Sequence, residues 1–469
     1  IGLHPEHCKR EKNMKASIFN VAQKYRDKIL LFNTYTTSML EIEEEVYNDI
    51  LCKNKFDQYQ KETLALYEMG FLIPDNFDEA AHQQALRQTV IDSNSGKIAN
   101  IIIAPTLECN AHCYYCFEKG HRRGTMSTET ADALIHHLKE NWNGRKLGIT
   151  WFGGEPLMAF DIIDYIIEGL NKNGIVFSSK ITTNGSLLTE DKIQHIKEKW
   201  NVDKIQITID AIGNEYNRIK NYTYIKDAFH TVVSNIKTAL SYGLKLKIRI
   251  NFDPEHKEKV LETMDYFNKN FPNENNLKIY FAPIDEDNDI VKNINSDFSD
   301  CYEHPYISLI KFGRKHNLYR GFPDMEDDDA EDDNDEKDFL KKLKIYPSVT
   351  NCYATCPSVY SIDPSGKIYK CHRVLGRPEY SSGDIFSGIQ KNQEYRYFCN
   401  TNPAYKECGE CQVLPICQGG CKINARIYKN KEACAPCKAI IKDLILLYKQ
   451  DIDNLNKISL KGGESSEGV

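Results

Sequence analysis

The middle of the chain shows a regular alternation of strand-like and helix-like patterns. Short apolar runs rich in β-branched and aromatic residues are separated by longer segments whose apolar positions have helical spacing. The strand-like runs lie at residues 99–107, 147–153, 176–183, 204–210, 245–252 and 277–284. The helical segments lie at about 127–141, 160–172, 189–198, 225–241 and 255–269. This order predicts an α/β fold in which right-handed crossovers curl six βα units into a partial (β/α)6 TIM barrel.

The residues before the barrel follow a different pattern. Residues 18–21 and 29–32 favour strands, residues 41–51 have helical spacing, and a second helical segment at 61–70 ends at a glycine. Strands followed by short helices fit a small winged-helix-like module. The alternative is an N-terminal extension that packs on the main domain.

After residue 285 the pattern becomes irregular. Between Asp324 and Asp338 stand eleven acidic residues and one lysine, which predicts a solvated loop. A cysteine-dense region then runs from Cys352 to Cys437, and a last helix is expected over about 438–456. We therefore divide the chain into a winged-helix-like module, the barrel, a connecting segment with the acidic loop, and a cysteine-rich domain with the last helix, at residues 14–95, 98–290, 291–344 and 345–460.

Composition and charge limit the expected location and partners of the protein. The chain has 469 residues and a formal net charge of -7, which argues against nucleic acid as the main partner. No uninterrupted apolar run reaches membrane length, and residues 1–15 are polar with charges of both signs. We therefore expect a cytoplasmic protein with no membrane and no nucleic-acid partner.

The chain has 16 cysteines, and their clustering without an export signal indicates metal chemistry rather than disulfides. Cys109, Cys113 and Cys116 form C-x3-C-x2-C directly after the first barrel strand, and barrels carry their chemistry at such strand ends. A four-iron cluster needs four ligands, so three cysteines on one loop would leave one iron open, as in a catalytic site. A zinc site completed by His112 or His121 is the alternative.

The sequence of this loop, CNAHCYYC, resembles the signature of the radical S-adenosylmethionine (radical SAM) superfamily, including the aromatic Tyr115 before the last cysteine. The resemblance covers roughly residues 98–285. It implies that S-adenosylmethionine chelates the open iron through its amino and carboxylate groups. An electron from the reduced cluster then cleaves the sulfonium bond, and the resulting 5′-deoxyadenosyl radical abstracts a hydrogen from the substrate.

Two further motifs at predicted strand ends match the same superfamily. Gly153, Gly154 and Glu155 resemble its GGE, in which the glycines allow a close approach and Glu155 would accept a hydrogen bond from the methionyl ammonium. Thr183 and Asn184, in the run TTNG that ends the third strand, resemble its TNG turn near the cofactor.

A third group of residues is also expected near the cofactor. The run TIDA resembles the S-x-D-G motif, which implies that Thr208 and Asp210 lie near the ribose, although Thr replaces Ser and Ala replaces Gly. Lys220 stands where relatives carry a carboxylate-binding Arg, and Arg218 is the alternative. Arg249 of the fifth strand either points into the barrel or forms a structural contact.

The second cysteine region follows a longer ordered pattern. Cys356 and Cys371 frame C-x9-G-x4-C around VYSIDPSGKIYK, which predicts a β-hairpin, and C-x2-C-x5-C-x3-C follows at residues 408–421. The series resembles the SPASM extension of peptide-modifying radical enzymes, which holds two auxiliary four-iron clusters. By this resemblance, one cluster would use Cys352, Cys356, Cys371 and Cys421, and the other Cys408, Cys411, Cys417 and Cys434.

Several cysteine assignments stay open. Cys437 competes with Cys434 as the last ligand. If Cys352 is not a ligand, the first auxiliary cluster has an open iron that could bind a substrate thiolate. The remaining cysteines are expected to be small buried residues, and for Cys301 and Cys399 the alternative is a thiol that assists hydrogen transfer.

The N-terminal module gains a role from the same resemblance. Its order of elements is similar to that of the precursor-recognition domain fused to peptide-modifying radical enzymes, which binds a leader peptide by strand addition at a sheet edge. We expect that edge around Leu30–Thr37. The expected partners are a precursor peptide with a leader sequence and reduced ferredoxin or flavodoxin as electron donor.

Together these features predict a radical SAM peptide maturase with three [4Fe-4S] clusters and S-adenosylmethionine. It would abstract a hydrogen from a carbon of a ribosomally made precursor and form a cross-link, in the favoured case a Cys thioether. Bond closure releases a second electron, for which the auxiliary clusters are a natural acceptor. The alternatives are a sulfatase-maturing enzyme that makes formylglycine, a peptide epimerase, and a non-catalytic iron–sulfur or zinc protein.

Overall fold

The structure is a computed structural model that describes residues 14–56, 60–93, 96–252, 257–272, 274–284, 307, 309–311, 347, 352–402, 406–428 and 437–463. The described residues form two compact units. Unit 1 joins the residues up to Val90 with those from Thr401 onward, and unit 2 joins the barrel segment from Ile91 with residues 352–400. The units therefore group the chain differently from the four predicted segments. The acidic run and the positions Cys8, Cys301 and Cys434 lie outside the described residues.

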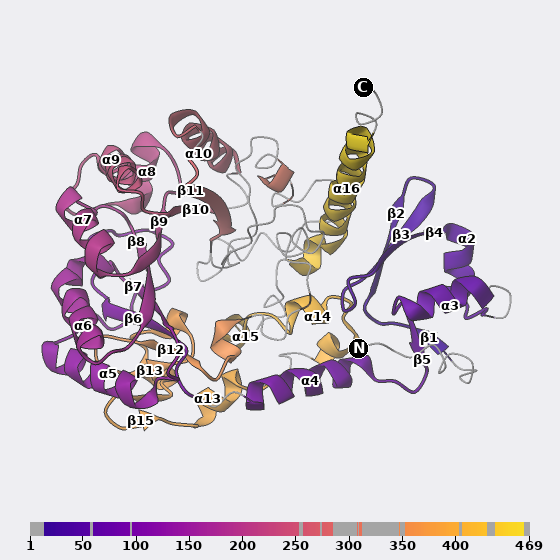
Figure 1. Cartoon of the computed structure of the whole chain (residues 1–469), viewed down its shortest axis with the longest axis horizontal. Helices are drawn as coiled ribbons and strands as arrows, with labels where there is room; N and C mark the ends of the chain where they lie inside the picture. The colour runs from indigo at the N-terminus through magenta and orange to yellow at the C-terminus, as the bar shows by residue number, and fades with distance from the viewer. Residues whose placement is uncertain are drawn as a thin grey trace. The chain divides into compact units, whose positions relative to one another are not determined.

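Unit 2 contains six parallel strands that lie side by side in chain order (Figure 1). They are β6 (Asn100–Thr106), β7 (Leu147–Gly153), β8 (Phe177–Thr183), β9 (Val202–Thr208), β10 (Leu246–Phe252) and β11 (Leu277–Pro283). The helices between them are α5 (Thr128–Asn141), a short 3-10 turn (Pro156–Ala159), α6 (Phe160–Lys172), α7 (Glu190–Lys199), α8 (Gly213–Lys220), α9 (Ala228–Ser241) and α10 (Lys257–Asn270). The predicted partial barrel is confirmed, and each predicted strand overlaps an observed one.

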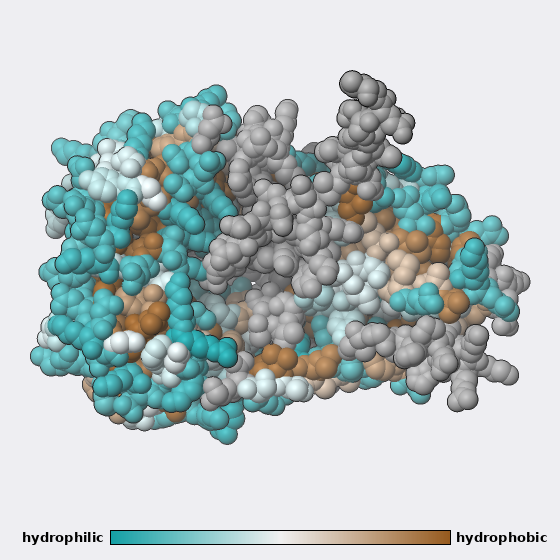
Figure 2. Space-filling model, in the orientation of Figure 1, coloured by the Kyte–Doolittle hydropathy of each residue, from teal (hydrophilic) through white to brown (hydrophobic). Residues whose placement is uncertain are grey.

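The hydrophobic pattern explains the packing of this barrel. Residues of β8 alternate between buried and half-buried positions, as in a strand with one face toward the helices. In α6, Ile163, Ile166, Ile167 and Leu170 are buried and recur at helical spacing. The outer faces of α5, α6 and α7 are mainly hydrophilic (Figure 2). The sequence pattern missed α8, because this short helix buries only Tyr216, Ile219 and Lys220.

The predicted hairpin of the second cysteine region extends the barrel sheet. Strand β12 (Val359–Ile362) pairs in parallel with β6 and turns back into the antiparallel β13 (Ile368–Tyr369). The result is one eight-stranded sheet. The other elements of this segment are β14 (Gly383–Asp384), β15 (Gly388–Ile389), α13 (Gln393–Phe398) and the 3-10 turns Tyr353–Thr355, His372–Val374 and Pro378–Tyr380.

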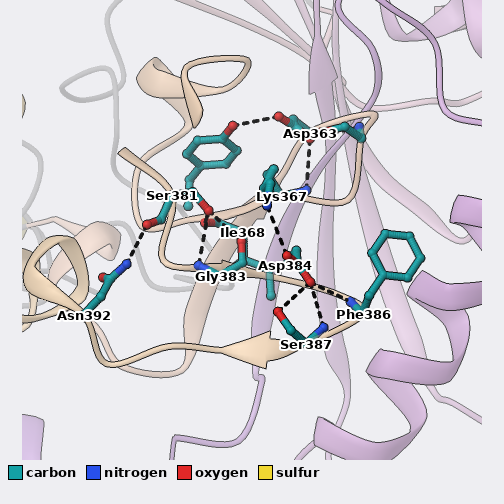
Figure 3. Close-up of polar contacts among 11 residues, drawn as sticks. Asp363, Lys367, Ile368, Ser381, Gly383, Asp384, Phe386, Ser387 and Asn392 are labelled. Carbon is teal, nitrogen blue, oxygen red and sulfur yellow. Dashed lines mark hydrogen bonds and ion pairs between the residues drawn. The ribbon is translucent and has the colours of Figure 1, made fainter. Parts of the chain in front are cut away.

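Polar contacts fix the hairpin to the strand pair that follows it (Figure 3). Lys367 on the hairpin forms an ion pair of 3.1 Å with Asp384. The same carboxylate accepts hydrogen bonds of 2.7 Å from the backbone N–H and the hydroxyl of Ser387. Asn392 donates to the carbonyl oxygen of Ser381 at 2.8 Å. These contacts hold the chain that leads away from Cys371.

Unit 1 contains a three-stranded antiparallel sheet in the order β2-β3-β4 and a separate β1-β5 pair. Its strands are β1 (Met14–Ala16), β2 (Asn20–Tyr25), β3 (Lys28–Asn33), β4 (Met39–Glu43) and β5 (Leu72–Pro74). Its helices are α2 (Glu44–Tyr47), a π-helical turn (Asn48–Cys52), α3 (Gln60–Glu68), α4 (Glu79–Ser93, up to Val90 in this unit), a 3-10 turn (Lys406–Glu410), α14 (Leu414–Cys417), α15 (Lys422–Tyr428) and α16 (Cys437–Gly463).

The sheet of unit 1 corrects one prediction. The segment around Leu30–Thr37 was expected to be a sheet edge, but β3 pairs with β2 on one side and with β4 on the other. Its residues Leu31 and Phe32 are fully buried, Leu31 in an apolar cluster with Leu66 and Phe71, and Phe32 against the ring of Tyr448. The edges of this sheet are therefore β2 and β4. Within the described residues, no helix is long and apolar enough to cross a membrane.

Candidate active site

The three cysteines of the C-x3-C-x2-C motif, Cys109, Cys113 and Cys116, lie on the loop after β6. Their side chains are half-buried, and the 12 cysteines whose side chains are described form no disulfide. Burial, with the charges of Glu155, Cys113 and Cys116, raises the pKa of Cys109 to about 12. Burial also raises the pKa of Cys113 and of Cys116. Three thiols held this close become stable thiolates only when a metal compensates their charge.

The end of β7 holds this cysteine loop at close range. The backbone N–H of Gly154 donates to the carbonyl oxygen of Thr106 at 3.2 Å, and that of Glu155 donates to Glu108 at 2.9 Å. Gly153 has a φ of 111°, a left-handed conformation that favours glycine. A Cβ atom on Gly154 would collide with the carbonyl of Glu108. Both glycines are thus required by the close approach of the two backbones.

Glu155 ties β7 to the end of β8. Its side chain is fully buried, and its carboxylate accepts hydrogen bonds from the Thr183 hydroxyl at 2.7 Å, the Asn184 N–H at 2.7 Å and the Leu157 N–H at 3.0 Å. Burial raises the pKa of Glu155, and these three donors oppose that shift. A carboxylate has about four acceptor positions, so one of them stays available.

The TTNG turn reaches the cysteine loop through Asn184. Its side-chain amide donates to the Asn110 side-chain oxygen at 2.7 Å and lies 4.0 Å from the Cys109 sulfur. Asn110 in turn donates to the Ser186 hydroxyl at 2.9 Å. The turn after β8 and the cysteine loop therefore form one hydrogen-bonded network.

A buried charged group joins the cysteine loop to β9 and α8. The Lys220 ammonium lies 2.8 Å from the Asp210 carboxylate and 2.8 Å from the Tyr115 hydroxyl, and Tyr115 donates to Asp210 at 2.5 Å. The Asn251 N–H also donates to Asp210, at 3.0 Å. Burial lowers the pKa of Lys220, but the negative groups around it, Asp210 foremost and then Tyr115 and Cys113, together outweigh burial and hold the pKa above its ordinary value. Lys220 is thus a buried cation beside the loop.

The structure does not bring Arg218 into this group. Its side chain is 68% exposed and forms an ion pair of 2.8 Å with Glu215 on the same helix. Arg249 lies beside Thr208 in the neighbouring strand and donates to the Asn251 side chain at 2.7 Å. Of the two cations that the sequence left as alternatives, Lys220 is therefore the one beside the cysteine loop.

A group of packed aromatic rings, which the sequence did not predict, lies between this loop and the second cysteine region. Ring centroids are 6.4 Å apart for Phe117 and Phe152, 4.7 Å for Phe152 and His372, and 5.7 Å for His372 and Tyr353. The Tyr353 hydroxyl accepts the His372 N–H at 2.9 Å. The sequence signal is an aromatic or histidine residue directly after a candidate ligand, at Cys116, Cys352 and Cys371.

Three candidate ligands of the first auxiliary cluster belong to unit 2. Cys352 and Cys356 flank the 3-10 turn Tyr353–Thr355, and Cys371 follows β13. The Tyr353 hydroxyl lies 3.9 Å from the Cys371 sulfur. The fourth candidate, Cys421, belongs to unit 1.

Two of the cysteines that are not candidate ligands are described. Cys399 is half-buried and Cys52 is exposed, so the expectation that the remaining cysteines are buried is wrong for Cys52.

The other cysteine group belongs to unit 1. Cys408 and Cys411 lie at the 3-10 turn Lys406–Glu410, and Cys417 is buried at the end of α14. Arg87 of α4 is buried, and burial lowers its pKa to about 10 while Cys417 opposes that shift. A pocket of about 380 Å³ is lined by residues that include Asp78, Gln83, Arg87, Thr401, Glu410 and Leu414.

The donor chemistry of the cysteine groups is compatible with iron–sulfur clusters. Among the described residues, no three Cys, His, Asp or Glu side chains are placed to hold one metal ion. A four-iron cluster needs a different arrangement of cysteines. Each cysteine binds a separate iron, so the sulfurs lie further apart than they do around a single ion. Groups of cysteines suit such clusters, because soft thiolates are preferred ligands of iron–sulfur centres.

This fold and this cysteine loop define a class of protein. Residues 103–267 match the model of the Radical SAM superfamily, so this segment of the chain is a radical SAM domain. The superfamily implies a [4Fe-4S] cluster and S-adenosylmethionine.

Particular relatives cover more of the chain. Radical SAM cyclopropyl synthase TigE of Paramaledivibacter caminithermalis is 23% identical over 92% of this chain and 97% of its own length. A GTP 3′,8-cyclase of Clostridium perfringens is 29% identical, over 38% of this chain and 54% of its own.

Solved structures share the fold. Native anSMEcpe with bound AdoMet matches with a TM-score of 0.56 and 17% identity, covering 75% of this chain and 99% of its own. Streptococcus suis SuiB bound to the precursor peptide SuiA matches with a TM-score of 0.50 and 15% identity, covering 89% of this chain and 97% of its own.

Proposed function

We propose that this radical SAM enzyme is a peptide maturase that abstracts a hydrogen from a ribosomally made precursor and closes a Cys thioether cross-link. The observation that carries the proposal is the cysteine loop after β6, which is bonded to the GGE end of β7, the TNG turn after β8 and the buried Lys220. The antiparallel module of unit 1 and the second cysteine region add to it.

The residues of the barrel have distinct roles in this proposal. Cys109, Cys113 and Cys116 would hold a four-iron cluster with one open iron. When bound, the cluster and S-adenosylmethionine supply the radical chemistry. Gly153 and Gly154 would let the backbone approach the methionyl group, and Glu155 would offer its remaining acceptor position to the ammonium.

The remaining cysteines would hold two auxiliary clusters. Cys352, Cys356, Cys371 and Cys421 would bind one, and Cys408, Cys411, Cys417 and Cys434 the other. Such clusters suit the chemistry, because closing a thioether bond leaves one electron that needs an acceptor. Reduced ferredoxin or flavodoxin would supply the electron that starts each turnover.

The sheet of unit 1 would bind the leader of the precursor by strand addition. Its two edges differ in character. β2 carries the exposed Lys24, a residue type that discourages pairing at an edge, whereas β4 begins with the half-buried apolar residues Met39 and Leu40. We therefore place the leader on β4. SuiB, which has been solved with its precursor peptide, supports a peptide substrate.

A second candidate function comes from the relative TigE, which is named a cyclopropyl synthase. Its similarity extends over 92% of this chain and so includes both the N-terminal module and the second cysteine region. The candidate is closure of a carbon–carbon bond within the precursor instead of a sulfur–carbon bond. Both reactions remove two hydrogens from the peptide, so mass alone does not separate them.

The test is anaerobic co-expression of the enzyme with a small reading frame encoded beside its gene, followed by mass spectrometry of the peptide. Loss of two hydrogens with a thiol that no longer reacts with iodoacetamide is the expected result. Loss of two hydrogens with every thiol alkylatable would instead support carbon–carbon closure.

Formation of formylglycine would contradict both and favour the sulfatase-maturing alternative. A peptide that keeps its mass in ordinary water but gains deuterium when the reaction is run in D2O would contradict both and favour the epimerase alternative. The control is the Cys113→Ala enzyme, which should leave the peptide unmodified.

A further inference from the structure

Lys370 is a buried lysine on the hairpin that carries the second cysteine region. It lies at the end of β13, directly before Cys371, and its side chain is 0% exposed. Its ammonium donates hydrogen bonds of 2.6 Å to the carbonyl oxygens of Cys356 and Val359. It also lies 4.3 Å from the ring centroid of Tyr360 and 5.6 Å from that of Tyr395.

The charge of this ammonium is not balanced by a carboxylate within the described part of the chain. Its two hydrogen bonds of 2.6 Å go to neutral carbonyls, and within the described residues it forms no ion pair with Asp or Glu. The ammonium instead lies beside the backbone of Cys356 and directly before Cys371, two candidate ligands of the first auxiliary cluster. A buried charge is costly unless an opposite charge lies close by.

A cluster bound by these cysteines would supply that opposite charge. Thiolates coordinate the irons of a four-iron cluster and give it a net negative charge, which becomes more negative on reduction. Lys370 touches the backbone of Cys356, one candidate ligand, and directly precedes Cys371, another. No other described lysine of unit 2 combines full burial with contact to a candidate ligand of this cluster.

We propose that Lys370 is the counter-charge of the first auxiliary cluster and sets its reduction potential. A fixed positive charge stabilises the reduced, more negative cluster and so raises the potential. This inference rests on the proposed auxiliary cluster at Cys352, Cys356 and Cys371. Lys370 acts as a positioning residue for charge, and does not touch substrate.

A purely structural role makes a different prediction. In that role Lys370 would serve only as a donor that joins the carbonyls of Cys356 and Val359. Lys370→Gln keeps two N–H donors for these two carbonyls and removes the charge, whereas Lys370→Arg keeps the charge. Lys367 is the matched control, because it lies on the same hairpin but is only half-buried and is already paired with Asp384 (Figure 3).

The experiment is a redox titration with dithionite, followed by electron paramagnetic resonance. The full-length chain is used in a background in which Cys109, Cys113 and Cys116 are changed to Ala, so that only auxiliary clusters contribute. In Lys370→Gln we expect the reduction equilibrium of one auxiliary cluster to shift about tenfold toward the oxidised form, which is about 59 mV for one electron. The other cluster, the Lys370→Arg variant and the Lys367→Gln variant should stay close to the parent.

Iron analysis of the same samples separates the possible failures. Unchanged potentials in Lys370→Gln at full iron content would overturn the proposal. If Lys370→Gln loses about four irons while Lys370→Arg keeps them, charge is needed to assemble the cluster, which supports it. Loss of iron in both variants would overturn it in favour of a structural role for the amine. A parent without iron outside the first cysteine loop would refute the auxiliary clusters themselves.

Discussion

At the residue scale, Lys220 is the buried cation that connects the cysteine loop with the end of β9. It forms the buried pair with Asp210 and also binds Tyr115, which stands inside the cysteine loop. The resemblance to the superfamily indicated a cation in this part of the chain. Arg218 and Lys220, which are two residues apart, were both candidates for it. The structure separates them by burial, because Lys220 lies on the inner face of α8 and Arg218 on the outer face.

Replacing Lys220 by Met should make local unfolding of β9 and α8 much more frequent. Removal of one partner of a buried ion pair leaves the other charge unpaired and costs about 3–5 kcal/mol. Hydrogen exchange of the segment around β9 and α8, measured by mass spectrometry, should accelerate by at least about a hundredfold. Arg218→Met is the control, and should change the opening free energy by less than about 1 kcal/mol because its ion pair is exposed. Equal effects of the two changes would contradict the assignment.

Cys113 carries the prediction for the chemistry. Cys113→Ala should abolish the formation of 5′-deoxyadenosine, because two cysteines cannot retain the cluster that cleaves S-adenosylmethionine. The product is measured by chromatography after reduction with dithionite. Cys52→Ala is the control, since this exposed cysteine lies far along the chain from every candidate ligand, and it should keep the parent rate. Persistent product in Cys113→Ala would refute the role of the loop.

At the scale of elements, β4 is the strand whose free edge matters. Asn33 donates to the Ser38 carbonyl across the β3–β4 turn at 3.0 Å, so hydrogen-bonded pairs alternate from that pair along the ladder. By this alternation Met39, Glu41 and Glu43 direct their N–H groups away from β3. These are the donors that an added leader strand would use.

Glu41→Pro should therefore weaken leader binding. Proline is tolerated at an edge strand, but it removes one outward N–H, so the dissociation constant should rise roughly fivefold to tenfold. Fluorescence anisotropy with a labelled leader peptide measures it. Glu41→Ala keeps the N–H and controls for the loss of the ion pair with Lys449. A weaker complex for Ala22→Pro on β2, with Glu41→Pro unchanged, would move the site to the other edge.

At the scale of the whole molecule, the number of clusters is the measurable quantity. Three four-iron clusters require about twelve irons per chain, and the triple change of Cys109, Cys113 and Cys116 to Ala should leave about eight. Iron and zinc are measured together by plasma emission after anaerobic reconstitution. About four irons in the parent would exclude auxiliary clusters, and stoichiometric zinc would favour the scaffold alternative.

Much of this molecule follows from its sequence alone. The repeat of apolar runs and helical spacing determined the six parallel strands of the barrel, because hydrophobic periodicity is a local property. The spacing C-x3-C-x2-C determined a three-cysteine loop. The motifs GGE and TTNG stand at predicted strand ends. Because parallel strands bring such ends to one edge of the sheet, these motifs were expected to lie near that loop. The hairpin after Cys356 was also recognisable from its turn residues.

The tertiary structure decided what depends on contacts between distant segments. The addition of β12 to β6, the central position of β3, the choice of Lys220 over Arg218 and the burial of Lys370 all depend on which elements pack together. A sequence lists each side chain with its neighbours in the chain, whereas burial and charge balance depend on neighbours in space. The sequence therefore determined the chemistry that the chain carries, and only the fold decided which charges face the cysteines.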